Sequence, residues 1–183
     1  MRYITASLMI GLALFLTACV PSLHPLYTEK DLTFDPALLG EWRETKPDSK
    51  STLTFTQGEG KAYKLTSKDG SDKAENYIAH LVKLGDKRFL DVKPDPSPAC
   101  DWSGLRWHMF FLVSQTEPTL RLWDLNDEWV ETLLKKNPAA LKHEIVDGDL
   151  LLTASTKQLQ DFVLRNVSTK GVFTDPVDYA RKR

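Results

Sequence analysis

The sequence has 183 residues, of which 42% are hydrophobic, and its 24 basic and 25 acidic residues give a formal net charge of −1. This balance excludes a strongly basic protein, so we expect no nucleic-acid partner. Only two cysteines, Cys19 and Cys100, are present, which excludes a scaffold built on several disulfides.

The N-terminal segment combines one basic residue with a short apolar run. Arg2 is the only charged residue before Cys19, and residues 7–16 are apolar after the first. The run has the length of a signal-peptide core and falls short of the roughly 20 residues that span a bilayer. It ends in Leu16-Thr17-Ala18-Cys19, which resembles the lipobox of bacterial lipoproteins. An ordinary signal peptide with an incidental cysteine is the alternative interpretation.

The lipobox resemblance implies a covalent lipid anchor. The thiol of Cys19 would take a diacylglycerol group, the signal peptide 1–18 would be removed, and the freed amine would take a third acyl chain such as palmitate. Two or more buried chains anchor a protein firmly. Val20 stands where lipoproteins of the inner membrane typically have Asp. We therefore expect an envelope protein that is lipid-anchored to the outer membrane and faces the periplasm, if the host is Gram-negative.

The remaining chain is long enough for one domain with its own core. Residues 19–35 are expected to form the lipidated cysteine and a tether, which is apolar enough to lie against the domain. Residues 36–170 are expected to form a single β-rich globular domain. Residues 171–183 are expected to be a poorly ordered C-terminal tail.

The first part of the domain alternates apolar and polar residues in short runs separated by turn signals, which indicates antiparallel strands. Asp35 and Pro36 predict one capped helical turn at 36–39. Strands are then expected at 51–56, 62–66, 77–84, 88–92, 105–113 and 120–125. The run at 105–113 is apolar almost throughout, which suits either a strand covered on both faces or a buried helix.

The second part of the domain changes to a helical period. A helix over 126–136 is predicted from Asn126 as its N-cap, acidic residues near its start, lysines near its end, and the stripe Trp129, Val130, Leu133 and Leu134. Asp147-Gly148 predicts a two-residue hairpin turn between strands at 143–146 and 149–153. Ser155 and Gln158 predict a capping box before a second helix.

Together these patterns predict an α+β fold. It is expected to be mainly an antiparallel β meander, barrel-like or a curved sheet, with two helices in the C-terminal half.

Residues that carry chemistry elsewhere form no known catalytic motif here. The four histidines, His24, His80, His108 and His143, lack the spacing of a zinc site, and no nucleophile elbow, phosphate-binding loop or dinucleotide-binding motif occurs. We therefore assign no catalytic, cofactor-binding or metal-binding residues. His80 and His108 fall within predicted strands and are interpreted as core or surface residues.

Two further features leave alternatives open. Cys100 follows a proline-rich stretch with no neighbouring base, so it is interpreted as an inert thiol, with an intermolecular disulfide or a reactive nucleophile as alternatives. Tryptophans usually belong to the core, yet four of them would also suit a ligand pocket: Trp102, Trp107, Trp123 and Trp129.

Two resemblances bear on the fold. Gly40-x-Trp42 resembles the lipocalin and calycin signature, which implies a barrel whose closed end holds the Trp, although a helix among the later strands departs from that pattern. Residues 22–32 and 34–42, with Trp129-x-x-x-Leu-Leu and 137–144, resemble a group of predicted bacterial lipoproteins with no assigned activity. The second resemblance implies only the anchor and a single domain.

The expected function is a non-enzymatic binding or assembly module at the cell envelope, which holds a partner protein or an apolar ligand. The alternative is an envelope hydrolase whose active site forms only in the fold. A deep apolar cavity would favour the first interpretation, and a cleft where histidines and carboxylates converge would favour the second.

Overall fold

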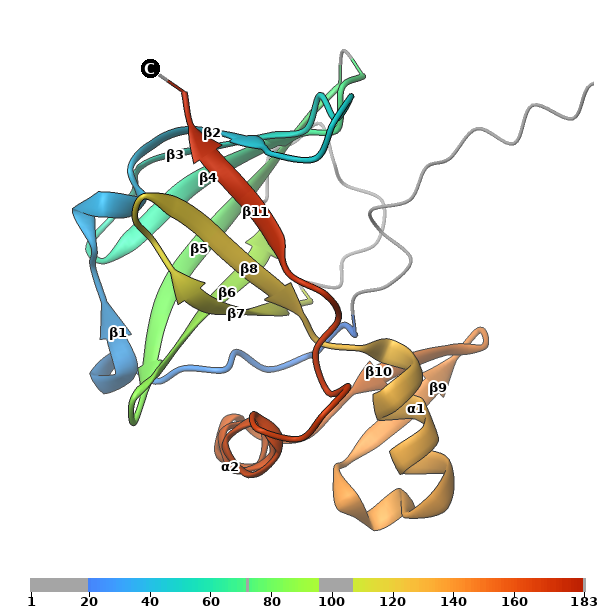
Figure 1. Cartoon of the computed structure of the whole chain (residues 1–183). Coiled ribbons are helices and arrows are strands. Elements are labelled where there is room, and N and C mark those ends of the chain that lie inside the picture. The colour runs from blue at the N-terminus through green and yellow to red at the C-terminus, as the bar shows by residue number, and fades with distance from the viewer. Residues whose placement is uncertain (1–19, 72, 96–106, 183) are drawn as a thin grey trace, which may run out of the picture.

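The computed structural model describes residues 20–71, 73–95 and 107–182. Cys19 with the rest of the lipobox, Cys100 and Trp102 lie outside the described residues. The predicted α+β fold is confirmed: an antiparallel β-barrel occupies the upper part of Figure 1, and two helices and a hairpin lie below it.

The barrel is a meander in which each strand pairs antiparallel with the next one along the chain. The last strand, β11 (Val177–Arg181), pairs with both β8 (Thr119–Asp124) and β2 (Gly40–Glu44), so the sheet closes on itself. A short strand, β1 (Leu32–Thr33), extends the edge of β5 beyond β4. The barrel strands are β2 (Gly40–Glu44), β3 (Thr52–Gln57), β4 (Ala62–Lys68), β5 (Ala74–Leu84), β6 (Lys87–Pro94), β7 (Met109–Gln115), β8 (Thr119–Asp124) and β11 (Val177–Arg181).

The C-terminal segment corrects one expectation. Residues 171–183 were expected to be a poorly ordered tail, but β11 lies within them and is the strand that closes the barrel. Tyr179 pairs with Glu44 of β2 on one side and with Leu120 of β8 on the other. Closure leaves neither β2 nor β8 as an open sheet edge, which is a stabilising arrangement for an antiparallel sheet.

The elements below the barrel are an insertion between β8 and β11. They are α1 (Asp127–Lys136), a 3-10 turn η4 (Pro138–Ala140), β9 (His143–Val146), β10 (Asp149–Leu152) and α2 (Thr156–Asn166). Two other 3-10 turns, η1 (Glu29–Asp31) and η2 (Pro36–Leu38), precede the barrel. Within the described part of the chain, no helix has the length and apolar character needed to cross a membrane.

The predicted caps and turn are confirmed. The side chain of Asn126 accepts a hydrogen bond from the backbone N–H of Trp129 at 3.1 Å, which starts α1. Ser155 and Gln158 form the capping box of α2. Asp147 and Gly148 both have positive φ, of 54° and 96°, as a two-residue turn that follows the strand twist requires.

Neighbouring residues of a strand point alternately into and out of the barrel. In strands β5 to β7, apolar side chains that point in either direction are buried. The inner face carries Leu81, Leu90 and Val113 into the barrel core. The outer face carries Val82, Phe89 and Phe110 into a second core. This second core joins the barrel to the insertion and includes Val130 and Leu134 of α1, Leu150 and Leu152 of β10, and Leu159, Phe162 and Val163 of α2.

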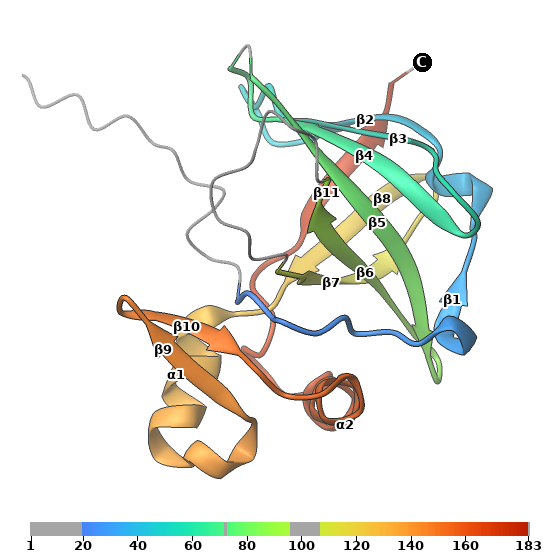
Figure 2. The same ribbon diagram turned by 180° about the vertical axis from the view of Figure 1, so that it is seen from behind.

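The chain from residue 20 runs between the barrel and the insertion, which is visible from both sides of the molecule (Figures 1 and 2). Val20 and Leu26 are buried in the second core. The expectation that this apolar segment lies against the domain is therefore confirmed for its described residues.

Candidate functional site

Residues 20–28, here called the N-terminal strap, are hydrogen-bonded into the domain on two sides. The backbone N–H of Ser22 donates to the carbonyl of His108 at 2.9 Å, and the N–H of His108 donates back at 2.8 Å. On the other side, Leu23 donates to the carbonyl of Leu152 and Leu152 donates to the carbonyl of Pro21, both at 2.9 Å. The chain is thus fixed to the domain from Val20 onward.

A fully buried carboxylate holds the middle of the strap. Asp91 lies on the outer face of β6, and one of its oxygens accepts a hydrogen bond from the backbone N–H of Leu26 at 2.7 Å. Its other oxygen lies 2.6 Å from Nδ1 of His108, which is 6% exposed. A buried carboxylate is tolerated when such donors replace its water. Asp91 therefore links the strap to both β6 and the start of β7.

Two aromatic side chains pack around this pair. Tyr27 of the strap lies against His80 of β5, with ring centroids 4.6 Å apart, and its ring lies edge-on to His108 at 6.5 Å. Burial, with smaller contributions from the charges of Asp91 and Glu29, raises the pKa of Tyr27 to about 12. Burial also lowers the pKa of His80, whose Nδ1 is enclosed without a hydrogen-bond partner among the described residues.

This cluster of Asp91, His108, His80 and Tyr27 was not predicted from the sequence. Of the two interpretations left open, core or surface, the structure places His108 in the interior, but its pairing with Asp91 was missed. The sequence contains one signal for the contact between His80 and Asp91. Alternation along the predicted strands 77–84 and 88–92 places both residues on the outer face, and in the structure they are direct cross-strand partners. His108 precedes the next strand, and its proximity to Asp91 depends on the register of β7.

The other histidines lie elsewhere. His24 is exposed on the strap, and Nδ1 of His143 lies 2.9 Å from the carbonyl oxygen of Leu141. No group of three or more metal-ligating side chains is found in the part of the chain that the structure describes.

The barrel interior is filled by large side chains rather than by a cavity at the described positions. Trp42, Phe55, Tyr63, Leu81, Leu90 and Leu120 are all essentially inaccessible to solvent. At these positions the side chains leave no space for a ligand between them.

Trp42 is fully buried at the end of the barrel next to the 3-10 turn η2. Its Nε1–H donates to the carbonyl of Leu38 at 2.8 Å. The guanidinium of Arg181 lies over the indole ring, 4.3 Å from its centroid, and also donates to the carbonyls of Ala37 and Leu39. Such a stacked cation is favourable over an indole face.

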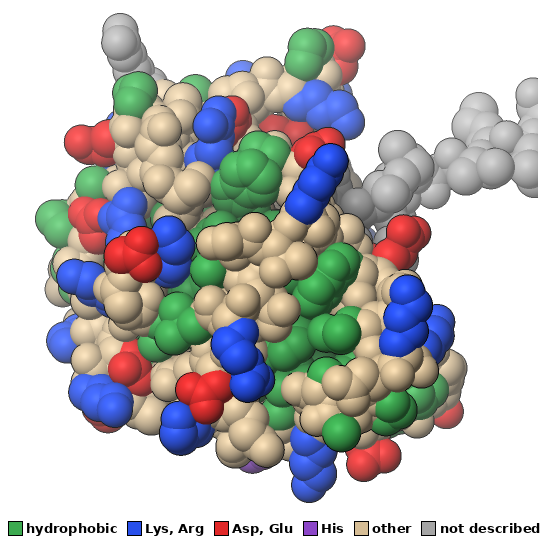
Figure 3. All heavy atoms as spheres, turned by 60° about the horizontal axis from the view of Figure 1, so that its bottom comes forward, with side chains coloured by type: hydrophobic (Ala, Val, Ile, Leu, Met, Phe, Trp, Pro, Cys, Tyr) green, Lys and Arg blue, Asp and Glu red, His purple; other side chains and the backbone are tan. Residues whose placement is uncertain are grey.

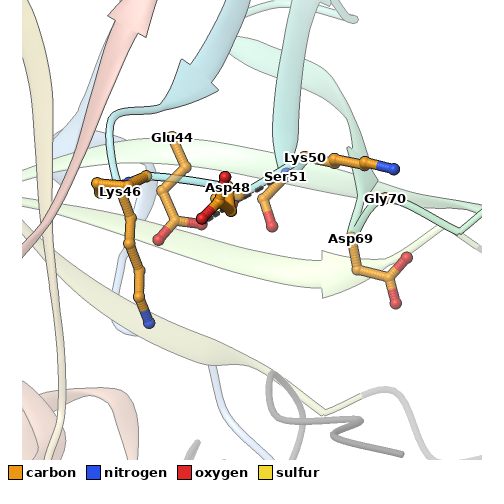
Figure 4. A pocket seen from close by; sticks show the side chains of 9 residues that line it. Glu44, Lys46, Asp48, Lys50, Ser51, Asp69 and Gly70 are labelled. Carbon is orange, nitrogen blue, oxygen red and sulfur yellow. Dashed lines mark hydrogen bonds between the residues drawn. The ribbon is translucent and has the colours of Figure 1, made fainter.

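The other end of β2 borders a polar groove of about 330 Å³ between the β2–β3 loop and the β4–β5 turn (Figure 4). Its lining carries charges of both signs, from the carboxylates of Glu44, Asp48 and Asp69 and the ammonium groups of Lys46 and Lys50. The hydroxyl of Ser49 donates to the carboxylate of Glu44 at 2.6 Å. The groove is shallow and its charges are mixed, so its lining selects no ligand class.

The tryptophans that the structure describes do not share a pocket. Trp129 packs in the second core, 6.3 Å from Phe162 between ring centroids. Trp123 donates from Nε1 to the hydroxyl of Ser114 at 2.9 Å, and Trp107 packs against the barrel core. These three side chains thus lie in different surroundings.

No protein-family model, curated protein or solved structure matches the chain. The fold and the residues are the only guides to function. A closed antiparallel barrel is compatible with the lipocalin-like resemblance of Gly40-x-Trp42 and with the fold of a binding module.

Proposed function

We propose that this chain is a lipid-anchored protein of the bacterial cell envelope, whose barrel domain is a non-enzymatic module that binds a partner protein. Acylation at Cys19 would supply the anchor after removal of residues 1–18. Val20 favours the outer membrane, with the domain in the periplasm.

The observation that carries this proposal is the fixed N-terminal strap. Cys19 is bonded directly to Val20, which is buried, and consecutive Cα atoms are about 3.8 Å apart. Acyl chains on Cys19 would hold the side of the domain from which the strap starts, between the barrel and the insertion, close to the bilayer surface (Figure 1). A module with a set orientation suits repeated docking of a partner at the membrane.

The packed barrel favours a protein over an apolar ligand as the molecule bound. A ligand the size of a fatty acid would have to displace side chains such as Trp42 and Tyr63, which are held by hydrogen bonds at the barrel end. The face that Figure 3 shows carries apolar patches with charged side chains between them. Mixed surfaces of this kind are usual at non-obligate protein interfaces.

A hydrolase is the second candidate, and the Asp91–His108 pair is the observation that favours it, because a carboxylate orients the imidazole of a general base. Here the pair lies beneath the strap, and the other carboxylate oxygen holds Leu26. We therefore expect His108→Gln to change stability and to leave partner binding by the folded protein intact. Loss of a measurable hydrolytic activity in this variant would favour the enzyme instead.

The test combines fractionation with cross-linking of the full-length protein in its native membranes. We expect the protein to sediment with membranes and the Cys19→Ala variant to be released or to remain unprocessed. Cross-links to one recurrent protein should map to a contiguous face of the barrel domain and decrease in the variant. Cross-links scattered over the whole surface, equal in both proteins, would contradict the binding module.

A further inference from the structure

We infer that Ile145 and Val146, next to the turn of the β9–β10 hairpin, insert shallowly into the lipid surface that holds the acylated Cys19. This inference rests on the proposed lipid anchor. Its observations are the direction in which the strap leaves the domain and the side chains that the tip exposes.

The strap runs parallel to β10. Ser22 and Leu152 form a parallel bridge, and Leu152 is hydrogen-bonded to the residues on both sides of Ser22. Moving back along the strap from Ser22 to Val20 is therefore moving along β10 from Leu152 toward Leu150. That direction leads to the turn at Asp147-Gly148, so the start of the described chain and the hairpin tip lie on the same side of the molecule (Figures 1 and 2).

The tip exposes apolar side chains at this place. Ile145 is 62% exposed and Val146 is 46% exposed, whereas most large apolar side chains of the described residues are buried in the two cores. Leu150, opposite Ile145 in the hairpin, packs into the second core beside Val20. The outer half of the hairpin is thus an apolar projection beside the point where the acyl chains would enter the membrane.

The charges near the tip indicate what kind of lipid contact this is. Glu144, Asp147 and Asp149 flank the apolar pair, with Lys142 as the only cation within residues 142–149. Attraction to anionic lipid therefore does not drive the contact. Shallow insertion of Ile145 and Val146, with the carboxylates remaining among zwitterionic headgroups, fits this pattern and depends on the anchor to bring the tip into place.

The alternative to a lipid contact is a partner protein bound along the edge of β9 that faces away from β10. Thr153 donates to the carbonyl of Lys142, so the backbone groups of His143 and Ile145 point away from β10. An extended segment of a partner protein would pair with this edge. That arrangement would leave the apolar side chains next to protein in the complex and next to water in protein-free vesicles.

The experiment uses the full-length acylated protein in vesicles of phosphatidylcholine that contain doxyl-labelled lipid. An environment-sensitive dye is attached at Ile145→Cys or Val146→Cys in a Cys100→Ser background. Lys46→Cys, in the exposed β2–β3 loop far from the hairpin in Figure 1, is the matched control. We expect a shift to shorter emission wavelength and quenching by doxyl lipid at 145 and 146, and neither at 46.

The possible failures are distinguishable. If the protein floats with vesicles and the dye at 145 and 146 behaves like the dye at 46, the anchor stands and the insertion of the tip is refuted. If the protein does not float and mass spectrometry finds Cys19 unmodified, the proposed anchor fails and the inference fails with it. Equal quenching at all three positions also refutes a contact specific to the tip.

Discussion

The carboxylate of Asp91 accepts a hydrogen bond from the backbone N–H of Leu26 at 2.7 Å, across 65 positions of the chain. This contact, with the pairing of Ser22 and His108, fixes the N-terminal strap to the outer face of β6 and β7. A protein attached to a membrane through such a strap has little freedom to turn relative to its anchor. The buried polar cluster is therefore interpreted as the part of the fold that sets the orientation of the domain.

Asp91→Ala should destabilise the protein strongly. The substitution leaves the N–H of Leu26 and Nδ1 of His108 without their acceptor in a buried site, and we expect a loss of about 3 kcal/mol in the free energy of unfolding. Urea unfolding of the full chain measures it. Asp86→Ala is the control, because Asp86 is exposed and a surface ion pair such as the one that it forms with Lys87 contributes little to stability. Equal stability of the two variants would show that the buried contact does not hold the strap.

Gly148→Val should weaken the hairpin. Gly148 has a φ of 96°, and a β-branched residue is strained at positive φ, so we expect a cost of roughly 1–2 kcal/mol. Apart from the chain neighbours, no atom would lie within 4 Å of an added Cβ, so the expected cost comes from backbone strain rather than from a clash at Cβ. Gly148→Asn, which tolerates positive φ better, should cost less in the same thermal melt. A valine variant as stable as the asparagine variant would contradict this explanation.

Trp42→Ala should be among the most damaging substitutions in the barrel core. The indole is fully buried and its removal leaves a cavity beneath Arg181, so we expect a loss of about 3–5 kcal/mol. Trp123→Ala is the matched control, since that side chain lies on the outside of the barrel and is partly exposed. Calorimetry of both variants should show a much larger decrease in Tm for Trp42→Ala. Similar decreases would mean that the barrel end is not closed by Trp42.

Asp124→Asn should stabilise the protein at neutral pH. Burial raises the pKa of Asp124 in the folded state above its unfolded value, so the wild type loses stability as the pH rises through the ordinary range of an aspartate. The gain of the variant should therefore be present at pH 7 and shrink as the pH falls below that range.

Asp178→Asn provides a control of opposite sign for Asp124. The hydrogen bonds that Arg121 donates hold the pKa of Asp178 below its usual value. Burial opposes this effect, and the charge of Arg121 adds a smaller lowering. The stability that Asp178 contributes is present above the usual aspartate pKa and is lost in acid. Unfolding curves from acid to neutral pH should show the two variants diverging in opposite directions from the wild type, and parallel curves would contradict both assignments.

Local signals predicted much of the fold. The hairpin followed from Asp147-Gly148, the helices followed from their caps and apolar stripes, and the run at 105–113 suited a strand with two covered faces. Each of these patterns is decided by residues close together in the chain, which is why they could be read without the fold.

The closing strand and the buried cluster could not be predicted in the same way. Residues 177–181 have only five positions with charges among them, and their strand character comes from pairing with β2 and β8. Asp91 and His108 meet because of the register between β6 and β7, which one sequence does not determine. The packed barrel interior is likewise a property of side chains brought together from all its strands.

The most direct test of the central proposal is mass spectrometry of the mature N-terminus of the protein purified from bacterial membranes. Anchoring through Cys19 predicts that residues 1–18 are absent and that the first residue is a cysteine carrying a diacylglycerol thioether. An unmodified Cys19, or cleavage at another position, would contradict it.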